Sequence, residues 1–110
     1  MIWIERVKNA HLSVTSAVSH HSRMQSDRYF VWAEEDAPAL SAEGKHAVSR
    51  VRGTTDFFTK IEYDPWKKKF EQALGRWGIS WELISIQYEE DTGFFHYEYS
   101  WEVPDGEDDF

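Results

Sequence analysis

The chain has 110 residues, no cysteine and a formal charge of −8 at pH 7. This length suits one domain, and the lack of cysteine excludes disulfides and thiolate-bound zinc or iron–sulfur centres. Residues 61–110 carry thirteen acids against four bases, a poor balance for neutralising the phosphates of nucleic acid. No stretch reaches the roughly 18 apolar residues of a membrane span, and the first residues lack a signal-peptide layout. We therefore expect a soluble protein that is not exported.

The first sixty residues predict one helix and three strands. Apolar residues at helical spacing favour the helix, and β-branched or aromatic runs favour the strands. The helix is expected over residues 2–10 and the strands over 12–18, 28–33 and 48–58. Gly53, inside the last strand, suggests a bulge or bend. Residues 34–45 hold a proline, a glycine and many small residues, which indicates a long loop that we expect to reach a neighbouring subunit.

The most regular predicted element is a helix that begins after Tyr63. Asp64 is a good N-cap residue, and Pro65 suits the first helical position. Gly78 is placed to end the helix. The large apolar residues recur at helical spacing and form one buried stripe, made of Trp66, Phe70, Ala73, Leu74 and Trp77.

Two alternating strands close the chain, joined by a turn over residues 89–93. The first is expected to place Glu82, Ile84, Ile86 and Tyr88 on one face, and Trp81, Leu83, Ser85 and Gln87 on the other. The second is expected to turn one aromatic face toward the helix, made of Phe95, Tyr97, Tyr99, Trp101 and Val103. Pro104 is expected to end this strand.

The predicted element order is α-β-β-β-α-β-β. Strands joined by hairpins between helices indicate an α+β fold, with an antiparallel or mixed sheet of about five strands and two helices packed on it. We expect residues 1–104 to form a single domain and residues 105–110 to form an acidic, disordered tail.

The histidines do not predict a metal site. His20 and His21 are adjacent, and adjacent side chains on a strand point to opposite faces, so we do not expect them to share a ligand. His11, His46 and His96 stand alone, without the spacing or acidic partners of a zinc motif. His96, on the polar face of the last strand, is expected to be solvated. We expect neither metal nor cofactor.

No catalytic motif is present either. The acidic runs 34–36 and 89–91 lie in predicted loops, where acids are usually solvated, and no calcium-loop motif is present. The sequence contains no Gly-x-Ser-x-Gly elbow and no glycine-rich phosphate loop. The basic run 67–69 lies near a helix N-terminus; we interpret it as a solubilising surface, with contact to an acidic neighbouring subunit as the alternative. We therefore expect a protein that is not an enzyme.

The layout of residues 28–103 resembles the head-to-tail joining or tail-terminator proteins of tailed bacteriophages and prophages. The resemblance lies in the order of segments rather than in any single motif. These segments are Tyr29-Phe30-Val31-Trp32, a loop with Leu40 to Lys45, Asp56-Phe57-Phe58-Thr59-Lys60, Asp64-Pro65-Trp66, the helix Lys67 to Trp77, Trp81-Glu82-Leu83-Ile84, Asp91-Thr92-Gly93, and His96 to Val103.

This resemblance implies a structural virion protein that forms a ring, often a hexamer, capping the tail tube and joining it to the head. It implies self-association, contact with tail-tube or head-connector proteins, and assembly in the bacterial host cytoplasm. DNA would pass through an acidic lumen without specific binding; a surface charged for solubility is the alternative reading of the acids. The alternative function is a monomeric acidic binding or regulatory module, such as an inhibitor that mimics nucleic acid. The candidate subunit contacts are Glu34, Glu35, Asp36, Leu40, Glu98 and Glu102.

Overall fold

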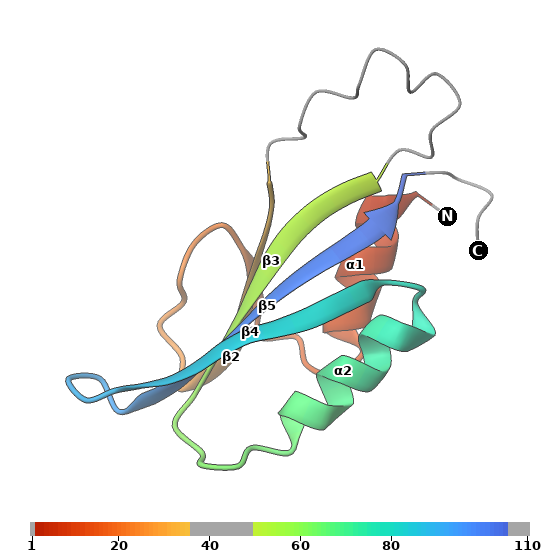
Figure 1. Cartoon of the computed structure of the whole chain (residues 1–110). Helices are drawn as coiled ribbons and strands as arrows, with labels where there is room; N and C mark the ends of the chain where they lie inside the picture. Colours follow the sequence, from red (N-terminus) through yellow and green to blue (C-terminus); the bar gives the residue numbers. More distant parts are fainter. Residues whose placement is uncertain (1, 36–49, 106–110) are drawn as a thin grey trace.

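The computed structural model describes residues 2–35 and 50–105, and confirms the α+β class (Figure 1). Within these ranges the chain forms two helices and five strands, in the expected order. The elements are α1 (Trp3–Leu12), β1 (Val18–His20), β2 (Arg28–Glu34), β3 (Arg50–Thr59), α2 (Trp66–Arg76), β4 (Ser80–Glu89) and β5 (Phe94–Pro104). Most of the predicted loop and tail lies outside the described residues.

The strands form one mixed sheet in the order β1-β2-β3-β5-β4. β1 runs parallel to β2, and every other neighbouring pair is antiparallel. Both helices pack on the same face of the sheet, and β1 and β4 form its two edges (Figure 1). We call the other face the open face.

The main core lies between the helices and the sheet. The aromatic face of β5 is buried as predicted, with Trp101 only 1% exposed and Tyr99 fully buried. Phe30 of β2 stacks on Phe57 of β3, with ring centroids 4.6 Å apart, and Phe70 of α2 packs against both Phe30 and Tyr99. Rings of this size each bury a large apolar area, so they stabilise a small domain without disulfides.

The predicted first strand over residues 12–18 is wrong. Helix α1 continues to Leu12, and β1 begins only at Val18. Ser13 donates a hydrogen bond from Oγ to the Ala10 carbonyl, and the Thr15 hydroxyl accepts one from the Ala17 amide. These short-range bonds turn the chain between α1 and β1, as serine and threonine often do. Residues 13–17, predicted to be part of a strand, therefore form a turn.

Gly53 does not form the predicted bulge, because β3 stays in continuous register with both β2 and β5. The glycine instead makes room for the Trp101 indole. A Cβ atom at position 53 would lie 2.3 Å from Trp101 Cη2 and 2.7 Å from the Ala33 carbonyl oxygen. Position 53 is therefore restricted to glycine by close packing.

We expect Gly53→Ala to lower the free energy of unfolding by about 1–3 kcal/mol, the usual cost of overpacking a rigid core. Gly75→Ala is the matched control, because nothing lies within 4 Å of its added Cβ and the residue is helical. That control is expected to raise stability by about 0.5–1 kcal/mol. Urea unfolding of both variants tests the pair, and equal effects at the two glycines would contradict the packing argument.

The bulge occurs in β4 instead, and it corrects the predicted faces of that strand. Leu83 pairs with Tyr99 and Ser85 with Glu98, so Ile84 is an extra residue between them. Beyond the bulge the alternation is shifted by one. Ile86 and Tyr88 therefore share the helix-covered face with Leu83 and Trp81, rather than the face of Glu82.

Helix α2 begins at Trp66 with Pro65 at the N-cap, one residue later than predicted, and Asp64 still bonds to its first turn. Asp64 Oδ1 accepts a hydrogen bond from the Trp66 amide at 2.9 Å. At the other end, Gly78 takes a positive φ of 71°, which glycine adopts without strain. The amide of Gly78 donates to the Gly75 carbonyl and that of Ile79 to the Leu74 carbonyl, which is the Schellman pattern.

Candidate functional site

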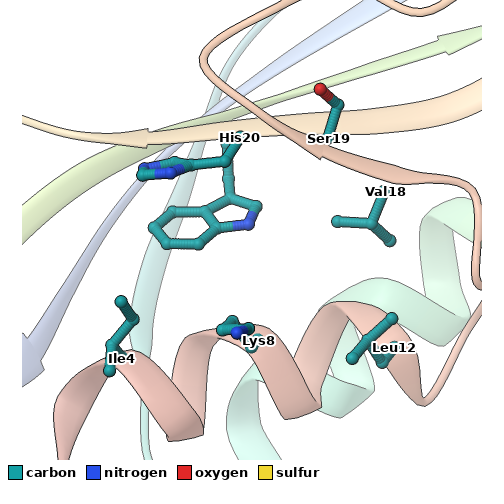
Figure 2. Close-up of a pocket in the computed structure, with 7 residues that line it drawn as sticks. Ile4, Lys8, Leu12, Val18, Ser19 and His20 are labelled. Atoms are coloured by element: carbon teal, nitrogen blue, oxygen red, sulfur yellow. The ribbon is translucent and has the colours of Figure 1, made fainter.

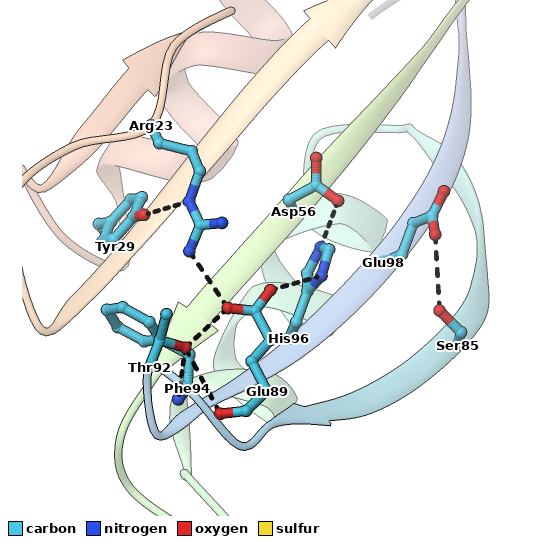
Figure 3. Close-up of polar contacts among 9 residues, drawn as sticks. All are labelled: Arg23, Tyr29, Asp56, Ser85, Glu89, Thr92, Phe94, His96 and Glu98. Carbon is cyan, nitrogen blue, oxygen red and sulfur yellow. Dashed lines mark hydrogen bonds and ion pairs between the residues drawn. The ribbon is translucent and has the colours of Figure 1, made fainter.

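The open face of the sheet carries a connected set of polar side chains (Figure 3). His96 of β5 lies between two carboxylates: Nε2 is 2.7 Å from Asp56 Oδ1, and Nδ1 is 3.6 Å from Glu89 Oε2. Glu89 accepts hydrogen bonds from Thr92 at 2.8 Å and from Arg23 at 3.3 Å. The bond from Thr92, supported by Arg23, lowers the pKa of Glu89 below its ordinary value. This set ties the β4–β5 turn to the segment before β2.

The expectation that His96 is solvated is wrong. Its side chain is 22% exposed, and its ring stacks on Phe58 with centroids 4.3 Å apart. Phe58 belongs to a second small apolar cluster with Tyr29 and Val31, and the Arg23 guanidinium lies 4.0 Å above its ring. The polar set therefore stabilises the open face of the sheet.

The predicted contact residues do not form one patch. Glu98 and Glu102 lie on the open face, where Glu102 pairs with Arg52 at 2.9 Å. Glu34, the last residue of β2, lies on the helix-covered face of the sheet. It pairs with Gly53, and Gly53 pairs in turn with the buried Trp101. Glu35 follows it and is exposed. The remaining candidates, Asp36 and Leu40, lie outside the described residues, as does His46.

One edge of the sheet exposes large apolar side chains, which we call the β4 edge: Trp81, Ile84, Ile86 and Tyr88. Their exposed fractions lie between 40% and 55%. In the described part of the chain, β4 pairs with β5 alone, so its outer backbone groups face outward. Natural edge strands are protected by lysine, proline, other charges or bulges; β4 has the bulge at Ile84 and contains neither lysine nor proline. Such an apolar edge is typical of a contact surface.

The opposite edge of the sheet contains a hollow of about 220 Å³, shown in Figure 2. Residues of α1 line one side of it, and β1 and β2 line the other. We call it the α1–β1 hollow; it is formed by Ile4, Lys8, Leu12, Val18, Ser19, His20 and Trp32. Leu12 is 51% exposed at its rim. The hollow is thus mainly apolar, with one basic side chain.

A cluster of potential metal ligands lies beside this hollow and contradicts the expectation for His20 and His21. β1 ends at His20, and His21 takes a positive φ of 74°, so the alternation of a strand no longer applies. His20 Nε2 lies 2.6 Å and His21 Nε2 3.5 Å from the same oxygen, Glu34 Oε1. The hydrogen bond from His20 lowers the pKa of Glu34 below its ordinary value.

The basic run at the start of α2 is partly engaged within the chain. Lys67 pairs with Glu71 at 2.9 Å, one helical turn later. Glu71 in turn accepts a hydrogen bond from Tyr99 at 2.8 Å, and burial of Tyr99 raises its pKa above the ordinary value. Lys68 and Lys69, which follow Lys67 in α2, are both exposed.

Within the described ranges, neither helix is long and apolar enough to cross a membrane. No protein-family model matches the chain, and the search of curated proteins finds no significant match.

Proposed function

We propose that the chain is a structural, non-enzymatic subunit that joins copies of itself head to tail into a closed ring. Its finer role would be that of a phage or prophage tail terminator or head-to-tail joining protein. The proposal rests on the presence of two unlike surfaces at opposite edges of one sheet, namely the apolar β4 edge and the α1–β1 hollow. The segment order described above supports the finer role.

The two surfaces are both mainly apolar, and they differ in charge. The β4 edge offers projecting side chains, including Ile86 and Tyr88, and the hollow offers an apolar recess of matching kind. β4 itself carries two acids, Glu82 and Glu89, and no lysine or arginine, whereas the hollow contains Lys8. A contact between unlike surfaces leaves one of each free on the complex, so further copies add, and a ring forms when the rotation between neighbours closes. We therefore assign the second copy of this chain as the occupant of the β4 edge.

The acids of the open face favour assembly over nucleic-acid mimicry. Glu102 is paired with Arg52 and Glu89 with Arg23. These pairs neutralise part of the negative field that a mimic of nucleic acid would present.

Sedimentation velocity of the purified chain at increasing concentration tests the proposal. We expect a defined oligomer for the wild type and a monomer for Ile86→Glu, because a buried charge at the β4 edge is strongly unfavourable. Gln87→Glu is the matched control, since Gln87 is an exposed neighbour on the other face of β4 and its variant adds the same charge. A monomeric wild type at all concentrations would overturn the proposal and favour the monomeric binding module.

A further inference from the structure

Three potential ligands from two strand ends converge at the β1 edge: His20, His21 and Glu34. All three donor atoms lie within 4.8 Å of one another. Two imidazoles share one carboxylate oxygen, at 2.6 and 3.5 Å. The side chains are 34–58% exposed, so a metal ion can reach them from solvent.

The spacing is close to that of a bound first-row metal. Zinc ligands at about 2.0–2.1 Å in a tetrahedral site lie roughly 3.3 Å from one another. The contact between His21 and Glu34 is 3.5 Å and already fits this value, whereas that between His20 and Glu34 is 2.6 Å, a direct hydrogen bond. A small rotation of the half-exposed Glu34 side chain would open that contact and admit an ion.

The surroundings fix both histidines in place. The His20 ring stacks on the buried Trp32 indole, with centroids 4.1 Å apart and planes 23° apart. The His21 amide donates to the Trp32 carbonyl at 2.9 Å, which anchors the backbone. A positive φ at a residue other than glycine costs free energy and persists where the surroundings enforce it. Here it directs the second imidazole back toward Glu34.

We propose that His20, His21 and Glu34 bind one divalent first-row transition metal ion, with zinc as the representative. Two imidazoles and one carboxylate suit zinc or nickel, whereas magnesium and calcium prefer oxygen ligands alone. Three protein ligands leave a fourth position for water or for an acidic group of another molecule. The ion would clamp the three-residue β1 to the end of β2. All three ligands belong to one chain, so binding needs no second copy, and His20 is also part of the α1–β1 hollow.

Isothermal titration of the untagged full chain with zinc chloride tests the proposal. We expect one zinc ion per chain, and His21→Gln and Glu34→Gln are each expected to weaken binding by about tenfold or more. His96→Gln is the matched control, because His96 also contacts a carboxylate at 2.7 Å but has no second imidazole beside it in the described structure. Its zinc affinity should equal that of the wild type. Magnesium chloride should give no binding.

Two further measurements keep the result clear. Circular dichroism and the melting temperature without metal check that each variant is folded, and zinc should raise the melting temperature of the wild type but not of His21→Gln. Repeating the titration on Ile86→Glu separates metal binding from assembly. An absence of zinc binding to the wild type, or equal affinity in wild type, His21→Gln and Glu34→Gln, would overturn the assignment.

Discussion

Asp64→Asn is expected to lower the free energy of unfolding by about 3–5 kcal/mol, the usual cost of removing one partner from a buried ion pair. The Asp64 side chain is fully buried and joins three elements. It accepts two hydrogen bonds from Arg28 of β2, at 2.8 and 2.5 Å, and one from Thr59 of β3 at 2.7 Å. It also accepts the Trp66 amide at the start of α2.

Asparagine keeps the size of this side chain but loses its charge and one acceptor. The Arg28 guanidinium, held 3.5 Å above the Trp66 ring and 29% exposed, would lose its carboxylate partner. Burial raises the pKa of Asp64, and the bonds from Arg28, Thr59 and Trp66 outweigh burial and leave it below its ordinary value.

Asp27→Asn is the matched control for this prediction. Asp27 also pairs with a cation, Lys60 at 3.5 Å, but its side chain is 82% exposed. An exposed pair contributes about 0–1 kcal/mol. Urea unfolding at pH 7 measures both variants. A loss below about 1 kcal/mol for Asp64→Asn would show that the buried pair does not hold β2, β3 and α2 together.

The second large expected effect is a loss of stability between pH 6.5 and 4, caused by His11. The His11 side chain is fully buried, and burial lowers its pKa to about 4. Nδ1 donates to the Val7 carbonyl at 2.7 Å, so Nε2 accepts from the Thr55 hydroxyl at 2.8 Å. The Thr55 oxygen in turn accepts the Trp101 indole N–H at 2.9 Å. This arrangement requires a neutral imidazole.

The direction in which stability changes with pH follows from proton binding. In the unfolded chain an ordinary histidine binds a proton below about pH 6.5, whereas the folded chain resists it down to about pH 4. The unfolded state therefore holds more protons in this window, and stability falls as the pH falls. The expected loss from pH 7 to pH 4 is about 3 kcal/mol.

Urea unfolding of wild type and His11→Gln at several pH values measures this effect. The variant is expected to be less stable at pH 7, because the bonds to Val7 and Thr55 are disturbed, but to lose less stability on acidification. Carboxylates with lowered pKa values, such as Glu89, add to the loss below about pH 5 in both proteins, so the difference between the two slopes isolates His11. The same slope in both proteins between pH 6.5 and 4 would assign the pH dependence to other groups.

Local signals in the sequence were sufficient for the second half of the fold. Helix α2 follows from its apolar stripe, Asp64 and Gly78, and the buried face of β5 follows from strict alternation over ten residues. These features depend on neighbours in sequence, which explains why their predictions are confirmed. The same applies to the turn at Gly93, which takes a positive φ of 79°.

The remaining features depend on residues far apart in sequence. The β4 bulge arises from pairing with β5, and it moves Ile86 and Tyr88 to the other face. Glycine is required at position 53 because the Trp101 indole packs against it. The pairing of Asp64 with Arg28 leaves no local pattern in the sequence. His20 and His21 converge only because β1 ends between them. No periodicity could reveal the α1–β1 hollow, since it forms where β1 pairs in parallel with β2.

Head-to-tail association is tested most directly by mixing two variants that each damage one surface. Ile86→Glu damages the β4 edge, and Leu12→Glu damages the α1–β1 hollow, at a side chain that is 51% exposed. In a contact between unlike surfaces, a mixture retains one intact pair, formed by the β4 edge of the Leu12→Glu chain and the hollow of the Ile86→Glu chain.

The measurement is sedimentation velocity of each variant alone and of their equimolar mixture. We expect monomers for each variant alone and a 1:1 dimer that grows no further for the mixture. A mixture that stays monomeric, or a Leu12→Glu variant that assembles like the wild type, would contradict head-to-tail association through these two edges.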